Sequence, residues 1–244
     1  MLMLLLYTGN ISAQVNVRDS VFSFSFGSIT GGFQVPGGDM ADRFGLNFNI
    51  GAGCFRKLHN NWVFGVQGEF MFGDQVKDRQ FLINLATSQG YLLTKDGTYG
   101  EVLLYERGWQ VQSKVGKIIP VVGPNDNSGI LLMAGAGFIQ HKIRIENQGS
   151  EIPYLEGDYV KGYDRLTNGW TISGFAGYAN FGNRKRVNFF IGLEYIVGMT
   201  ESRRDFNFDT RRKDNQKRSD ILYGLKAGWI IPFYKKMPNA FYYD

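Results

Sequence analysis

Histidine is the usual general base near neutral pH, and this chain of 244 residues has two histidines. His59 lies in a segment that we interpret as a short turn, where it would be a solvated surface residue. His141 precedes Glu146 near one end of an apolar stretch, and with a nearby serine the two could form a nucleophilic site. Lys142 and Arg144 equally favour a polar stripe there. We therefore predict no enzymatic activity, with a His141-dependent enzyme as the alternative.

Motifs for metals and cofactors are also lacking. Cys54 is the single cysteine, so the chain has no internal disulfide and no C-x-x-C spacing, and we interpret it as a small apolar strand residue. The glycine-rich segment 31–38 lacks the Gly-Lys-Ser/Thr that completes a phosphate loop. Asp39 and Asp42 follow it, but two carboxylates are too few for a calcium site. We predict no cofactor and no bound metal.

Eight stretches of the chain alternate apolar residues with small or polar ones. In Phe44–Phe55, for example, phenylalanine, leucine and isoleucine alternate with glycine and asparagine. Successive strand side chains point to opposite faces, so each stretch predicts a strand with one apolar face. The fifth is the least regular, because both its faces are apolar at the start. The predicted strands are roughly 21–34, 44–56, 62–72, 102–121, 130–145, 166–181, 187–199 and 221–234.

The connections between these strands alternate in length. The links after the second, fourth and sixth strands are short, whereas the others are longer, at 34–43, 73–101, 146–165 and 200–219. Bacterial outer-membrane barrels have short periplasmic turns and long outer loops, and a soluble sandwich gives no reason for this rule. We therefore predict an all-β fold, an eight-stranded antiparallel transmembrane β-barrel. Mean hydropathy of −0.21 with 15% aromatic residues agrees with a single lipid-facing surface.

This alternation also divides the polar residues between lumen and lipid. An eight-stranded barrel is just wide enough for its interior side chains to fill it, and opposite charges can pair there. We expect a filled lumen with a charge network of Glu69, Lys114, Glu194 and Lys226. Tryptophans mark membrane interfaces, and we expect two aromatic girdles formed by Trp62, Trp109, Trp170 and Trp229.

Positive charge gathers in one predicted outer loop. The chain carries a net charge of +5, and the loop 200–219 contains the basic patch Arg203, Arg204, Arg211, Arg212, Lys213, Lys217 and Arg218. Such a patch can contact the phosphates of lipopolysaccharide or an acidic partner, and a solvated segment without a binding role is the alternative. In loop 73–101, a run of apolar residues predicts a short amphipathic helix at the membrane surface or against a partner: Phe81, Leu82, Ile83 and Leu85. Nucleic acid is not expected as a partner.

The N-terminal segment has the features of a clipped signal peptide. Met1–Tyr7 is almost wholly apolar, and Ser12-Ala13-Gln14 resembles a cleavage site for export. We predict a signal-peptide remnant over 1–13 and a single β-barrel domain over 14–244 with a short periplasmic tail. A buried N-terminal strand is the alternative for the first segment.

The whole pattern after the signal resembles the small outer-membrane barrels of the OmpA, OmpX and OmpW type. The style of the chain, including Ser12-Ala13-Gln14, resembles exported proteins of Bacteroidota. Unlike such barrels, which usually end on an aromatic strand residue, this chain continues past Phe233 with a tail to Asp244.

The resemblance implies a non-enzymatic structural or accessory subunit in the outer membrane of a Gram-negative bacterium. Its expected partners are membrane lipid, lipopolysaccharide and another outer-membrane protein or complex. The alternatives are a barrel enzyme acting on outer-leaflet lipid, a narrow pore like those of the OmpW type, and a soluble lipocalin-like carrier.

Overall fold

The computed structural model describes residues 21–147, 151–182 and 187–233. The predicted signal segment 1–13, most of the expected turn 182–185 and the tail from 234 onward lie outside these residues.

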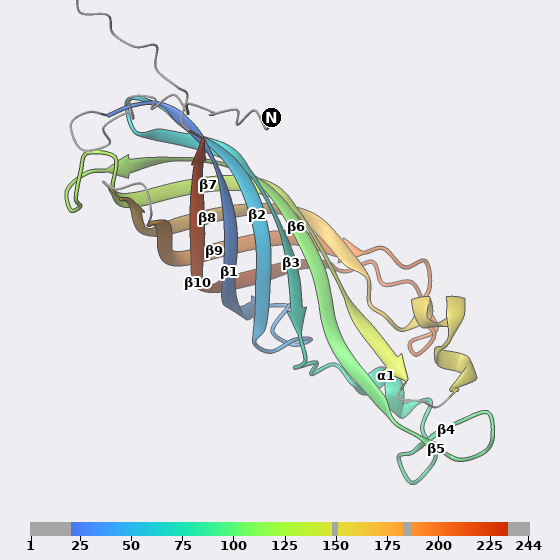
Figure 1. The fold of residues 1–244 in the computed structure, drawn as a ribbon. Coiled ribbons are helices and arrows are strands. Elements are labelled where there is room, and N and C mark those ends of the chain that lie inside the picture. The colour runs from blue at the N-terminus through green and yellow to red at the C-terminus, as the bar shows by residue number, and fades with distance from the viewer. Residues whose placement is uncertain (1–20, 148–150, 183–186, 234–244) are drawn as a thin grey trace, which may run out of the picture.

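The main sheet is a closed antiparallel barrel of eight strands (Figure 1). Each strand pairs with its neighbours in the chain, and the last strand closes the ring on the first, as shown by pairs such as Gly31 with Ala227. This confirms the predicted fold. The strands are β1 (Phe24–Gly38), β2 (Asn47–Lys57), β3 (Trp62–Gly73), β6 (Val102–Ile119), β7 (Gly129–Asn147), β8 (Thr167–Phe181), β9 (Asn188–Ser202) and β10 (Lys217–Phe233).

Short elements lie in the long connections, at the opposite end of the barrel from the short turns (Figure 1). They are the helix α1 (Gln80–Ile83), the strands β4 (Leu92–Leu93) and β5 (Tyr99–Gly100), and the 3-10 helices η1 (Pro153–Leu155) and η2 (Gly157–Gly162). The connection 39–46 is no longer than the turn 120–128, so the length rule holds only for the other three long loops.

The first strand lies further along the chain than predicted. It runs to Gly38 because its last residues still pair with β10, where Val35 lies opposite Tyr223 and Pro36 opposite Leu222. Pro36 lacks a backbone N–H donor, and a strand tolerates this loss near its end. Gly38 then takes a left-handed conformation, with φ of 57°, and the strand stops there.

Phe44 does not face outward as predicted. The second strand begins at Asn47, and Phe44 lies before it, fully buried under the long loops. The backbone N–H of Gly45 donates to the carbonyl of Gln75 at 2.7 Å, and this contact turns the chain toward the barrel mouth. The aromatic ring thereby joins an apolar cluster, which removes more of its surface from water than a place on the barrel wall would.

The outer surface of the barrel is apolar all the way round. Every strand exposes large apolar side chains, among them Ile29, Ile50, Val66, Val115, Leu132, Ile172, Leu193 and Leu225. Such a belt is far larger than the apolar patches that soluble proteins leave exposed.

The interior near the short turns is also apolar, and we call this region the apolar plug. Phe24 and Phe26 point inward, where both contact the ring of Phe181 with ring centres 5.2 and 5.9 Å apart. This explains the irregular fifth strand, because Leu131 fills the plug while its neighbours face outward. The plug comprises Phe24, Phe26, Phe55, Val63, Ile118, Leu131, Phe175, Ala179, Phe181, Phe190 and Ile230.

A second apolar cluster closes the other end, beneath the long loops. Phe81 of α1 is fully buried there and lies 6.1 Å from the ring of Tyr163, measured between ring centres. The expected helix therefore exists, but it packs against the other loops of its own chain. Apolar residues of the long loops and of the strand ends thus form one core over the barrel mouth, including Met40, Phe44, Val76, Leu92, Leu104, Ile143, Ile152 and Leu155.

Candidate functional site

The structure brings the four charged lumen residues together in one layer, the ionic layer, above the apolar plug. Lys114 Nζ lies 2.6 Å from Glu194 Oε1, and Lys226 Nζ lies 2.6 Å from Glu69 Oε1. Lys226 also contacts the second carboxylate oxygen of Glu194. All four side chains are buried, so each charge depends on its partners and not on water.

Neutral polar side chains complete the ionic layer around Glu69. Gln110 and Gln67 donate to its carboxylate at 2.6 and 2.7 Å, and Thr30 donates at 3.3 Å. Between this layer and the apolar plug the structure leaves a void of about 20 Å³, which is room for about one water molecule. The lumen is thus filled at two successive levels.

A third polar group surrounds Asp220 near the outer mouth of the barrel. His141 Nε2 lies 2.9 Å from Asp220 Oδ2, and the hydroxyl of Thr200 donates to the same oxygen at 2.6 Å. Arg43, carried by the connection 39–46, reaches down to Asp220 Oδ1 at 3.0 Å and donates to the hydroxyl of Thr167, also at 3.0 Å. A loop residue is therefore tied into the top of the lumen.

The pairing of His141 with Glu146, on which the alternative enzyme depends, is wrong. The two residues are five positions apart on β7, so their side chains lie on opposite faces of the strand. His141 is fully buried in the lumen, whereas Glu146 pairs with Arg144, 2.6 Å away, at the strand end. In the described part of the chain the Nδ1 atom of His141 has no hydrogen-bond partner. No serine hydroxyl therefore donates a hydrogen bond to this atom, as a nucleophile activated by His141 would.

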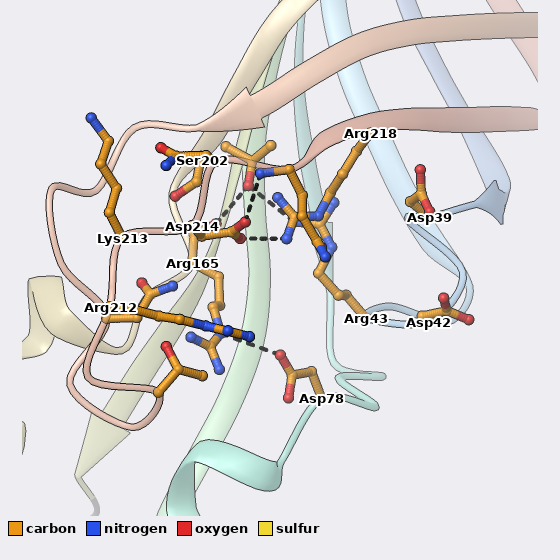
Figure 2. A pocket seen from close by; sticks show the side chains of 15 residues that line it. Asp39, Asp42, Arg43, Asp78, Arg165, Ser202, Arg212, Lys213, Asp214 and Arg218 are labelled. Atoms are coloured by element: carbon orange, nitrogen blue, oxygen red, sulfur yellow. Dashed lines mark hydrogen bonds and ion pairs between the residues drawn. The ribbon is translucent and has the colours of Figure 1, made fainter.

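An open cavity of about 610 Å³ lies above this group, between the long loops (Figure 2). Arg165 forms one of its walls and joins two loops, because it lies 3.4 Å from Asp78 and 2.5 Å from Asp209. Burial alone would raise the pKa of Asp209, but the hydrogen bonds and charge of Arg165 outweigh it and lower that pKa below its usual value. The cavity walls are therefore fixed by ion pairs between loops.

The basic patch divides into a paired and an unpaired half. Arg203 lies 2.9 Å from Glu201, while Arg204 contacts Asp164 and Arg218 contacts Asp214. Four members are exposed and have no ion-pair partner among the described residues: Arg211, Arg212, Lys213 and Lys217. Of these, Arg212 and Lys213 line the cavity. The available positive charge is therefore smaller than the sequence suggests.

The four tryptophans all lie on the outer surface of the barrel. Trp109 and Trp170 lie toward the long loops, and each contacts the ring of Phe138 between them at 5.8 Å. Trp62 lies beside the short turn 58–61, where Lys117 Nζ is 5.9 Å from the centre of its ring. Trp229 lies late in β10, opposite Ile29.

Some residues of these sites escaped the sequence analysis. Asp220 shares the inward alternation of Lys226, and extending the last predicted strand by one residue would have identified it. Glu106 shares the alternation of Lys114 within the predicted strand 102–121, so that strand alone indicated its inward face. Glu106 is buried and accepts hydrogen bonds from Asn47 at 3.1 and 3.2 Å. Arg43 gave no such signal, because it lies in a loop.

No helix in the described part of the chain is long and apolar enough to cross a membrane. A closed eight-stranded sheet with an apolar exterior and a filled interior is the architecture of small transmembrane barrels. The protein is therefore an outer-membrane β-barrel, and its place is the bacterial outer membrane.

The sequence matches no protein-family model and no curated protein. Its fold is similar to that of Neisserial surface protein A (TM-score 0.46, 11% identity, covering 86% of this chain and 97% of that one). It is also similar to Ail, the attachment invasion locus protein of Yersinia pestis (0.41, 12%, 86% and 99%). A third similar structure is the N-terminal β-barrel domain of Pseudomonas aeruginosa OprF (0.35, 10%, 84% and 97%). At these identities the likeness concerns the fold alone.

Proposed function

We propose that this barrel is a non-enzymatic structural or accessory component of the outer membrane, whose outer loops contact lipopolysaccharide or a partner protein. The observation that carries the proposal is the filled lumen. The apolar plug and the ionic layer occupy it in succession, whereas the long loops form a packed surface that carries unpaired charge.

The same observation speaks against a narrow pore. A conducting barrel needs a continuous aqueous path, and here aromatic rings and buried ion pairs lie across that path. The purified protein in planar bilayers should give no single-channel conductance at 1 M salt. A steady conductance that disappears when Phe26 is replaced by a larger tryptophan would contradict the proposal and favour the pore.

The orientation of the barrel is part of the proposal. We assign loops 73–101, 146–165 and 200–219 to the cell exterior because long loops face outward in such barrels. In a Cys54→Ser background, a cysteine at Asp214 should react with a membrane-impermeant maleimide on intact cells. A cysteine at Asn60, in the short turn 58–61, should react only after lysis, and the reverse result would invert the assignment.

Contact with lipopolysaccharide depends on the unpaired half of the basic patch. Replacing Arg211, Arg212 and Lys213 with serine should leave the barrel folded, because exposed loops tolerate change. It should lower the amount of co-purifying lipopolysaccharide or loosen a partner complex. The effect should weaken in high salt, since the Debye length falls from about 10 Å at 0.1 M to about 3 Å at 1 M.

The matched control replaces Arg203 and Arg204, which are already paired with carboxylates of their own chain. If the triple variant kept its lipopolysaccharide and partner content, the loop 200–219 would be a solvated segment without a binding role. A signal peptide over 1–13, the single domain over 14–244 with its short periplasmic tail, and the Bacteroidota origin stay predictions.

A further inference from the structure

The outer-loop cavity has two walls of opposite charge that are not used inside the protein. Arg212 and Lys213 are exposed on one wall, and Asp39 and Asp42 are exposed on the other. Figure 2 shows these two pairs on opposite sides of the cavity. None of the four has an ion-pair partner within the described ranges, although Asp39 accepts a hydrogen bond from the backbone of Ser219 at 2.6 Å.

The charges between the two walls are already paired. Three arginines line the middle of the cavity and each is paired with a carboxylate: Arg43 with Asp220, Arg165 with Asp78, and Arg218 with Asp214. Arg165 also holds Asp209, so these paired groups carry one surplus negative charge. The unpaired groups left for a ligand are two positive ones on one side and two negative ones on the other. A ligand of one sign would be attracted by one wall and repelled by the other.

We propose that this cavity binds a small zwitterion, a short peptide with free termini. Its carboxylate would lie at Arg212, with Lys213 adding positive charge at the rim, and its ammonium group would lie on the side of Asp39 and Asp42 (Figure 2). Guanidinium groups bind carboxylates through charge-assisted hydrogen bonds, and carboxylates bind ammonium groups in the same way.

The size and the neutral lining agree with a peptide of about three residues. The cavity volume of about 610 Å³ lies within the range of about 300–1,000 Å³ that small-molecule pockets occupy. Three extended residues span about 10 Å, which separates the two terminal charges. Neutral polar side chains also line the cavity and are at least partly exposed, so that they can hydrogen-bond to the peptide groups between the two termini: Ser202, Thr210, Asn215 and Gln216.

This inference does not depend on contact with lipopolysaccharide, and calorimetry on the full-length protein tests it directly. The protein is folded in an uncharged maltoside detergent at low salt, so that no detergent headgroup competes. The probes are triglycine, N-acetyl-triglycine, which lacks the ammonium group, and triglycine amide, which lacks the carboxylate. Triglycine should bind, and each capped form should bind at least tenfold more weakly.

Two variants assign the walls. Arg212→Ser with Lys213→Ser should bind triglycine no better than the amide, because the carboxylate has lost its partners. Asp39→Asn with Asp42→Asn should bind it no better than the acetylated form, and Asp42→Asn alone repeats this test without touching the Asp39 hydrogen bond. The control Arg211→Ser with Lys217→Ser changes the same charge outside the cavity lining and should keep the wild-type affinity.

Three results would overturn the proposal. The first is wild-type protein that binds none of the three probes. The second is an acetylated or amidated form that binds as tightly as triglycine, since one wall would then have no role. The third is a control variant that loses as much affinity as the cavity variants, because the attraction would then come from the general charge of the loop.

Discussion

The apolar plug and the ionic layer fill the same lumen by different physical means. In the plug, rings such as Phe26 and Phe181 contact several neighbours, and dispersion and burial have no preferred partner atom. In the ionic layer, Lys226 is held by two carboxylates, and each oxygen has a named partner. A region of the first kind should tolerate substitution, whereas a region of the second kind should tolerate only changes that keep its charges balanced.

The largest expected effect is the loss of a single charge from the ionic layer. Lys226→Met leaves Glu69 buried without its cation, and removing one partner of a buried pair typically costs about 3–5 kcal/mol. Equilibrium urea unfolding in detergent micelles measures the change in the free energy of unfolding. Lys217→Met, at the exposed start of the same strand, is the control and should change it by less than about 0.5 kcal/mol. Similar losses in both variants would mean that the register of β10 is misassigned.

A conservative change in the apolar plug should cost less. Phe181→Leu keeps the site apolar and loses the edge contacts with Phe24 and Phe26, so we expect a loss of about 1–2 kcal/mol. The same unfolding experiment compares it directly with Lys226→Met. A loss larger than that of Lys226→Met would show that the plug, and not the ionic layer, is the less tolerant region.

Removing a balanced pair from the ionic layer should cost little. Lys114→Met with Glu194→Leu deletes one charge of each sign and leaves Lys226 paired with Glu69, so the double variant should lie within about 1 kcal/mol of the wild type. Each single variant leaves an uncompensated charge and should be clearly less stable than the double. Additive losses in this double-mutant cycle would show that the two residues do not act as a pair.

The smallest expected effect is local and depends on pH. The pKa of Asp209 is held below its usual 3.8, since the hydrogen bonds and charge of Arg165 outweigh burial. The folded loop therefore binds a proton less readily than the unfolded one, and this stabilisation is full above about pH 4 and is lost as the pH falls through the folded pKa.

Hydrogen exchange of residues 203–216, corrected for intrinsic rates, should accelerate below that pH while the barrel strands stay protected. Asp209→Asn should exchange fast at every pH. An unchanged pH profile in that variant would show that another group controls the loop.

The sequence alone predicted the barrel because strand alternation is a local signal. Glu194, for example, has an apolar residue on each side, so the alternation indicates that its own side chain lies on the opposite face. All eight strands were located within a few residues. Phe44 was misplaced because the turn that carries it inward depends on a contact with Gln75, which no local pattern reveals. The plug was missed for a related reason, because phenylalanines on an inward face have the same letters as phenylalanines facing lipid.

The candidate sites were predicted less completely. The members of the ionic layer follow from alternation, but the cavity does not, because its walls come from separate loops. Three of the seven members of the basic patch are paired with acids, and one of these acids, Asp164, lies forty positions before Arg204. The pair Asp214 and Arg218 is closer in the chain and could have been inferred from its spacing of four residues.

The contact between Arg43 and Asp220 joins residues 177 positions apart, from the connection 39–46 to the last strand. A chain that has not yet added β10 cannot make this contact, nor those of Lys226, nor the seam between β1 and β10. Each of these interactions therefore requires β10 to be in place in the closed ring. A barrel without β10 would leave the facing edges of β1 and β9 unpaired. Arg43 would then have lost Asp220, and Glu69 would have lost Lys226. The partners carried by β10 thus couple closure of the seam to the neutralisation of the lumen and to the anchoring of the connection 39–46.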